Sequence, residues 1–111
     1  MGQVALVVEA MQAADRAGID RRTLFSILSR GAANSGTLQK MVPPSLEGDY
    51  TGHAFSLGHG AKDVRYAREL LAGSDTGKIM TEALAHYYAL QEERHSSDSL
   101  LSRLLVPEKN D

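Results

Sequence analysis

Apolar residues recur every three to four positions along most of this chain, the spacing expected when a helix buries one face. The first such run, from Gln3 to Ala17, carries an apolar arc wide enough to need more than one covering element. Glu9, Gln12 and Arg16 are predicted to form its polar side. Gly18 is predicted to end this helix, because glycine takes the left-handed conformation of a C-terminal cap at little cost.

Further helical segments follow, separated by glycine, proline and serine. They are expected at Arg21–Arg30 with Asp20 as cap, in a short turn around Leu38 to Val42 closed by Pro43-Pro44, at Ala61–Ala72, at Gly77–Arg94 with Asp75 or Thr76 as cap, and around Leu100 to Leu105 before Pro107. Ile27, Leu70, Ile79 and Met80 are assigned to their buried faces. Residues 43–60 are predicted to form a long ordered loop.

No stretch shows the two-residue alternation of a β-strand. The chain is therefore predicted to be all-α, a single helical domain of about five to six helices over residues 1–106, with a frayed tail at 107–111. The apolar pattern is already running at Val4, with no capping Ser, Thr, Asp or Asn before it. We therefore expect the first helix to be truncated, a longer helix cut at Met1-Gly2.

At 111 residues and 42% hydrophobic content, the chain can bury one core but is too short for a second, dinucleotide-binding domain. The net charge of -2, without a basic stripe, gives no reason to expect nucleic acid or a membrane as partner. The absence of cysteine excludes disulfides, Cys-ligated zinc and a thiol nucleophile. Without a membrane-length apolar run or a signal peptide, the protein is expected to be cytoplasmic.

Most candidate chemistry fails on spacing. Four histidines (His53, His59, His86 and His95) suggest a metal, but they form no ligand pair on one helix, so no metal site is predicted. Gly58 to Lys62 lacks the spacing of a Walker phosphate loop. Neither a G-x-G-x-x-G fingerprint nor a G-x-S-x-G nucleophile elbow occurs.

Lys62-Asp63 is more informative, because the pair falls where the Gly-rich segment is predicted to turn into a helix. Asp63 in the first turn would complement the helix dipole, which is a structural role. Lys62 is either an ordinary surface lysine or a cation placed against a ligand phosphate, ribose or carboxylate. Spacing alone leaves both alternatives open.

Several short motifs occur in the order and at the separations of one enzyme family. The family's E-A-x-x-L-A-x-x-x-G-(IVL)-(DN) segment is similar to Glu9-Ala10, Ala14 and Gly18-Ile19-Asp20. Its G-x-x-x-S-x-x-x-x-x-K segment is similar to Gly31 to Lys40, which includes Ser35. Phe55, seven residues before Lys62-Asp63-Val64-Arg65-Tyr66-Ala67, matches F-x-x-x-x-x-x-K-D-(LV)-x-x-A, and Ala83 to Tyr88 and Ser97 to Leu101 resemble its closing segments. On these motifs the chain resembles the C-terminal domain of the 3-hydroxyisobutyrate dehydrogenase, or β-hydroxyacid dehydrogenase, family.

The resemblance implies the fold of the 6-phosphogluconate dehydrogenase C-terminal domain, beside a Rossmann-type N-terminal domain that is missing here. NAD or NADP and a short β-hydroxy acid would lie between the two domains in the intact enzyme. Lys62 matches the family lysine that faces the cofactor and is the one cofactor-binding residue that we predict. The family's catalytic lysine belongs to a G-x-x-x-K-x-x-x-N pattern that would fall before Met1, so we assign no catalytic residue. No tight binding of NAD or NADP to this chain alone is expected.

Two segments depart from the family pattern. Gly58-His59-Gly60 replaces bulkier, more apolar residues, and Gly73 to Gly77 replaces an apolar stretch that ends in proline. The leading hypothesis is the C-terminal helical domain of an NAD(P)-dependent β-hydroxyacid dehydrogenase, an oxidoreductase. Such a domain would contribute to the substrate and cofactor cleft and to a homodimer, and it would be inactive alone, so whether this chain is itself an enzyme stays open. The alternative is a non-catalytic helical oligomerisation or interaction module that associates through the apolar arc of Val4 to Ala17.

Overall fold

Helices account for almost all regular structure in residues 1–108, the part of the chain that the computed structural model describes. In order along this part they are α1 (Gly2–Ala17), α2 (Arg21–Ser29), α3 (Gly36–Leu46), α4 (Leu57–Leu70), α5 (Asp75–Arg94) and the 3-10 helix η1 (Leu101–Leu105). Within the same residues, β structure is limited to one bridge between Ser56 and Leu100. The prediction of an all-α fold is confirmed.

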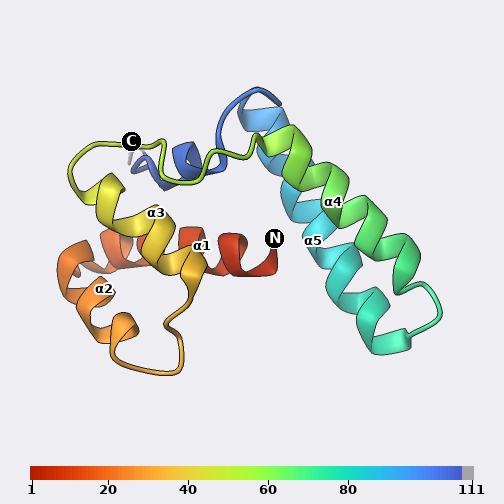
Figure 1. Cartoon of the computed structure of the whole chain (residues 1–111), viewed down its shortest axis with the longest axis horizontal. Helices are drawn as coiled ribbons and strands as arrows, with labels where there is room; N and C mark the ends of the chain where they lie inside the picture. Colours follow the sequence, from red (N-terminus) through yellow and green to blue (C-terminus); the bar gives the residue numbers. More distant parts are fainter. Residues whose placement is uncertain (109–111) are drawn as a thin grey trace.

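The helices form two parts, which Figure 1 shows side by side. α1, α2, α3 and η1 pack on one another, and we call this part the lobe. α4 and α5 pack along each other as an antiparallel pair, the arm (residues 57–94), which projects from the lobe. The fully buried arm residues Leu57 and Tyr88 lie at its base, whereas the turn that joins its two helices forms its free end.

α1 is the central helix of the lobe and contacts α2, α3, η1 and α5. Its apolar arc is therefore mostly interior: Val4, Val8 and Met11 are at most 2% exposed. Leu6 is 74% exposed, and the small residues Ala13 and Ala17 of the arc are exposed as well. The hypothesis that the arc of Val4 to Ala17 is an interface is wrong for most of that surface, because the lobe itself covers it. Gly18 ends α1 in the left-handed conformation, with φ at 72°, as predicted.

Gln12 does not lie on a solvent-facing side of α1, as the polar pattern predicted, but is 3% exposed. Its Nε2 donates to the carbonyl oxygens of Leu104 at 3.0 Å and Val106 at 2.9 Å. Its Oε1 accepts from the Glu108 backbone N–H at 3.2 Å. This side chain fastens the segment after η1 to the lobe as far as Glu108. The remainder of the predicted frayed tail, positions 109–111, lies outside the described residues.

The arm buries a different face of α5 from the one the apolar pattern predicted. Thr81, Tyr88 and Gln91 point inward, whereas Ile79 and Met80 are 69% and 62% exposed. Thr81 is tolerated inside because its hydroxyl donates to the Gly77 carbonyl oxygen at 3.0 Å. Leu70 of α4 and Ile27 of α2, also predicted to be buried, are 84% and 60% exposed. Toward its free end the arm consists of two helices with no third element over them, so one apolar face stays in solvent.

The predicted loop at residues 43–60 is shorter than expected at both ends. α3 continues to Leu46 with Pro43 and Pro44 inside it, although proline removes a helix hydrogen bond. Ser35 supports the start of this helix by accepting from the Leu38 backbone N–H at 3.0 Å. The other end of the loop is shortened by α4, which begins at Leu57 and carries the candidate site.

Candidate functional site

α4 starts four residues earlier than predicted because Ser56 caps it. The Ser56 hydroxyl accepts from the His59 backbone N–H at 3.1 Å, so the Gly-rich segment is already helical. Lys62 and Asp63 therefore lie in the second turn, and the first turn contains no acidic residue. The predicted role of Asp63 at the helix dipole is wrong for that reason. Lys62 is held on a regular helix rather than delivered by a flexible loop.

Two glycines in this helix allow close packing at the base of the arm. A Cβ at Gly58 would lie 3.2 Å from the Ser97 carbonyl oxygen, and one at Gly60 would lie 3.2 Å from Met1 Sδ. The Gly58 backbone N–H donates to that same Ser97 oxygen at 2.9 Å, and the Leu57 N–H donates to the Ser99 carbonyl oxygen at 2.7 Å. These contacts fix the start of α4 against residues 97–101. The departure of Gly58-His59-Gly60 from the family pattern thus has a packing explanation in this chain.

A row of aromatic and basic side chains runs from the loop before α4 onto its outer face. We call it the strip, and it consists of His53, Phe55, His59, Lys62 and Tyr66. The Phe55 ring meets the rings of His53 and His59 edge to face, with centroids 5.5 Å and 6.2 Å away. Lys62 Nζ lies 5.8 Å from the centroid of the Tyr66 ring, one helical turn further on. Lys62 is exposed, and Phe55 and Tyr66 are 49% and 59% exposed.

His53 is the electrostatically perturbed member of the strip. Partial burial, and next the positive charge of Lys40, lower its pKa below the ordinary value of 6.5. Its backbone N–H donates to the Ser102 hydroxyl at 2.7 Å, and its Nδ1 accepts from the Phe55 backbone N–H at 3.4 Å. That acceptor role requires a neutral imidazole with an unprotonated Nδ1. At neutral pH His53 therefore positions Phe55 and carries no charge.

The donor set of the strip fits part of a nicotinamide dinucleotide. Lys62 supplies a cation for a phosphate, a ribose hydroxyl or a carboxylate, and Phe55 supplies a half-exposed ring for an apolar or aromatic group. Lys62 is exposed on the surface of α4, so a ligand bound there would be in contact with this chain on one side only. A site enclosed on both sides needs a second surface opposite the strip.

The other predicted features lie elsewhere or are not gathered. His86 is within α5 and His95 caps its end, so the two are in different elements from His53 and His59. Residues 1–108 hold no group of three or more His, Asp or Glu side chains that could bind a metal ion. No helix among them is long and apolar enough to cross a membrane.

Sequence reasoning predicted Lys62 as a site residue and placed Phe55 in the same motif, but it missed His59 and Tyr66 as their neighbours. Tyr66 follows Lys62 by four residues, the spacing at which two side chains meet on one helical face. That signal was available in the sequence. The placement of His59 was not, because it depends on Ser56 starting the helix before the Gly-rich segment.

Two comparisons with known proteins found similarity over most of the chain. Residues 1–105 match a family described as NAD-binding of NADP-dependent 3-hydroxyisobutyrate dehydrogenase. The chain is also similar to the uncharacterised oxidoreductase YkwC of Bacillus subtilis (strain 168), with 28% identity over 103 residues. The similar region is 90% of this chain but 35% of that relative, so the chain spans a minor part of the relative's length.

Proposed function

We propose that this chain, which belongs to the 3-hydroxyisobutyrate dehydrogenase family, forms one wall of the cofactor and substrate cleft of an NAD(P)-dependent β-hydroxyacid dehydrogenase. The opposite wall would be a Rossmann-type domain, which binds the dinucleotide through its own glycine-rich turn. The observation that carries the proposal is that Phe55 and Lys62 are both exposed and stand at the positions of the family's F-x-x-x-x-x-x-K-D motif.

In the intact enzyme the strip has a binding and positioning role. NAD or NADP would supply the hydride acceptor for oxidation of the alcohol carbon of a short β-hydroxy acid. The Lys62 ammonium would hold an anionic or hydroxyl group of that cofactor by a charge-assisted hydrogen bond. Phe55 would cover an apolar face and exclude water next to it. The proton of the substrate hydroxyl would pass to a base outside this chain, the lysine of the family's G-x-x-x-K-x-x-x-N pattern.

Since this chain provides one wall, we expect it to have no dehydrogenase activity alone. The assay incubates the 111-residue chain with 3-hydroxyisobutyrate and NAD or NADP and follows the absorbance of the reduced cofactor. Turnover that survives repurification of the chain would contradict the one-wall proposal.

The ligand surface can be tested on the chain as it stands. We expect NADP added to an isotope-labelled sample to shift the backbone amide signals of residues 53–66 with millimolar affinity, and Lys62→Met to remove the shifts. Lys78→Met is a matched control, because Lys78 is an exposed lysine of the other arm helix. Shifts centred elsewhere, or an equal loss in both variants, would contradict the assignment of the strip.

Self-association is a second part of the proposal, and a specific observation favours it. Three large aliphatic side chains near the free end of the arm (Leu70, Ile79 and Met80) are each more than 60% exposed. Exposed apolar residues that form a contiguous patch on a soluble protein mark an interaction surface. We therefore retain a homo-oligomer as the proposed assembly, through the arm and not through the arc of α1.

A further inference from the structure

We propose that Tyr66 is a positioning residue of the candidate site, whose ring holds the Lys62 ammonium ready for an anionic group of the dinucleotide. The inference rests on the proposed binding role of Lys62 and deepens it by naming the side chain that orients the lysine. Tyr66 occupies an unspecified position of the family's K-D-(LV)-x-x-A motif, so the resemblance assigns it no role.

Tyr66 and Lys62 are neighbours on one face of α4, because side chains four residues apart in a helix stand one turn apart. Lys62 Nζ lies 5.8 Å from the centroid of the Tyr66 ring, within the range of a cation–π interaction. A free lysine side chain samples many rotamers, and an anion that binds it must restrict them. The contact with Tyr66 restricts them in advance, so part of that entropic cost is removed from the binding step.

The fold does not need an aromatic ring at position 66. Tyr66 is 59% exposed and is not among the residues that pack against the hydrophobic core. Its hydroxyl forms no hydrogen bond to residues 1–108, whereas the hydroxyls of Tyr87 and Tyr88 do. Neither core packing nor hydrogen bonding accounts for the ring, whereas the contact with Lys62 does. We therefore expect replacements of Tyr66 to leave the fold intact.

The Lys62 ammonium has no negatively charged partner within the described chain. Four residues of α4 lie one turn before or after it, and none is acidic: Gly58, His59, Arg65 and Tyr66. The adjacent Asp63 stands about 100° further round the helix and lines a hollow between α5 and the start of α1. No ion pair within residues 1–108 includes Lys62. A cation that is held in place without an internal counter-charge is suited to an external anion.

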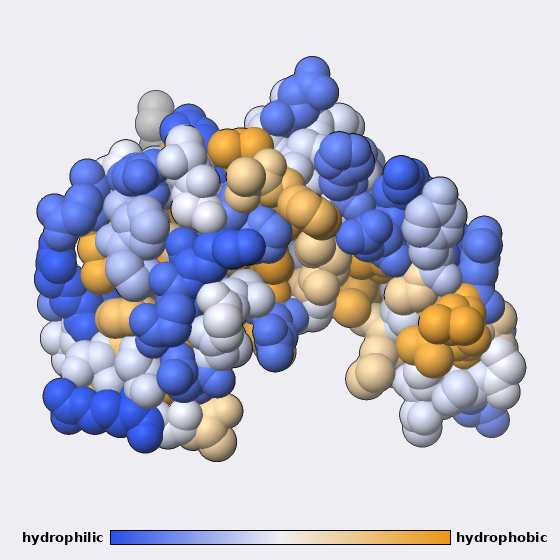
Figure 2. Space-filling model, in the orientation of Figure 1, coloured by the Kyte–Doolittle hydropathy of each residue, from blue (hydrophilic) through white to orange (hydrophobic). Residues whose placement is uncertain are grey.

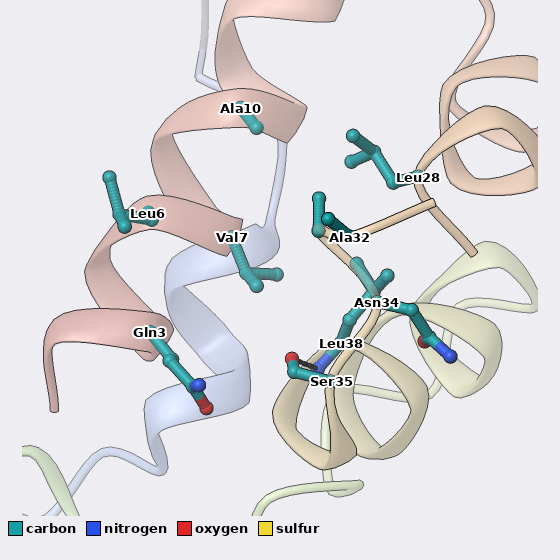
Figure 3. Close-up of a pocket in the computed structure, with 10 residues that line it drawn as sticks. Gln3, Leu6, Val7, Ala10, Leu28, Ala32, Asn34, Ser35 and Leu38 are labelled. Atoms are coloured by element: carbon teal, nitrogen blue, oxygen red, sulfur yellow. Dashed lines mark hydrogen bonds between the residues drawn. The ribbon is translucent and has the colours of Figure 1, made fainter. Parts of the chain in front are cut away.

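Two other surfaces of the chain are apolar and unsuited to the phosphates of a dinucleotide. The first is a groove between α1 and the segment that joins α2 to α3, with a volume of about 410 Å³ and no ionisable side chain in its lining. Figure 3 shows Val7 and Ala10 of α1 facing Leu28 and Ala32 across it. The second is the apolar patch that Figure 2 shows near the free end of the arm. An anionic ligand should therefore favour the cation of the strip over these two surfaces.

The first experiment observes the contact by NMR in the full chain without ligand. Protons held over an aromatic ring resonate upfield, so we expect the ε-methylene protons of Lys62 to lie upfield of those of Lys78, which has no aromatic residue one turn away on α5. Tyr66→Leu should move the Lys62 signals to the position of the Lys78 signals, and Tyr66→Phe, which keeps the ring, should not. Circular dichroism checks that each variant is folded. Lys62 signals that stay unchanged in Tyr66→Leu would overturn the proposal.

The second experiment titrates the same variants with NADP and follows their backbone amide signals. We expect Tyr66→Leu to weaken binding about two- to fivefold, the contribution of an exposed cation–π contact, and Tyr66→Phe to bind like the natural chain. Equal affinities of Tyr66→Leu and the natural chain, together with a loss of binding in Lys62→Met, would overturn the role of Tyr66 and leave that of Lys62 standing. Lys62→Met without effect would overturn both.

Discussion

Replacing Gln12 by methionine tests how the lobe holds the end of the chain. The methionine side chain has nearly the same length and fits an apolar environment, but it cannot donate to the carbonyl oxygens of Leu104 and Val106 or accept from Glu108. Each hydrogen bond contributes about 1 kcal/mol net, and a buried acceptor left without a partner costs about 1–3 kcal/mol. We therefore expect the free energy of unfolding to fall by about 3 kcal/mol, a large share of the 5–15 kcal/mol typical of a domain.

Urea unfolding followed by circular dichroism measures this change. The midpoint should fall while the slope of the free energy with urea stays the same, since the surface exposed on unfolding is unchanged. In a thermal melt the same loss corresponds to roughly 12 °C for a domain of this size. Gln39→Met is the matched control, because Gln39 donates to Ser29 and Asn34 at the exposed surface. Equal losses in the two variants would refute the buried-anchor role of Gln12.

Three further predictions concern the arm, the strip and a helix end. Tyr88→Phe should lower the free energy of unfolding by about 1 kcal/mol, because its buried hydroxyl donates to a backbone carbonyl at 2.7 Å. Tyr87→Phe removes a hydroxyl that makes a 3.4 Å contact at the surface, so it should lower the free energy of unfolding less than Tyr88→Phe does. A larger loss for Tyr87→Phe in urea unfolding would contradict this. The pKa of His53 in the folded state lies below the ordinary value of 6.5, so the unfolded state binds the proton more readily. The contribution of His53 to the free energy of unfolding is therefore complete above pH 6.5 and declines as the pH falls below it. His53→Gln should flatten that decline, so an unchanged pH profile of unfolding would argue against it. Gly18→Ala should lower the free energy of unfolding by about 1 kcal/mol, because alanine is strained at the φ of 72°. Gly31→Ala should not lower it, since Gly31 has open space around it and no positive φ. Equal shifts of the two melting temperatures would contradict the role of backbone strain at Gly18.

Local sequence signals predicted the helix boundaries best where a single residue determines the start or end of a helix. Gly18 ends α1 as expected. Asp20 stands at the N-cap position of α2 as expected, but its side chain makes no capping hydrogen bond. The start of α4 was missed because one serine, Ser56, caps a segment whose glycines suggested a loop. Those glycines are needed by long-range packing against residues 97–101, which no local pattern reveals.

Burial predicted from helical periodicity was wrong where contacts with distant parts of the chain, or their absence, determine which residues are buried. Gln12 is interior because three backbone groups far along the chain satisfy it. Ile79 and Met80 are exposed because the free end of the arm has no third element over it. The motif predicted Lys62 as the one cofactor-binding residue. Its contact with Tyr66 could have been predicted from their four-residue spacing, whereas the contact of His59 with Phe55 depends on where α4 starts.

The most direct test of the central claim joins this chain to the part of YkwC that it does not cover and measures the affinity of the product for NADPH by fluorescence. The claim is that Lys62 faces the cofactor across a cleft between two domains. A charge-assisted hydrogen bond contributes about 1.5–3 kcal/mol, so Lys62→Met should weaken NADPH binding by roughly ten- to a hundredfold. Lys78→Met, on the other arm helix, should leave the affinity unchanged. A folded chimera that binds NADPH equally well with and without Lys62 would contradict the claim.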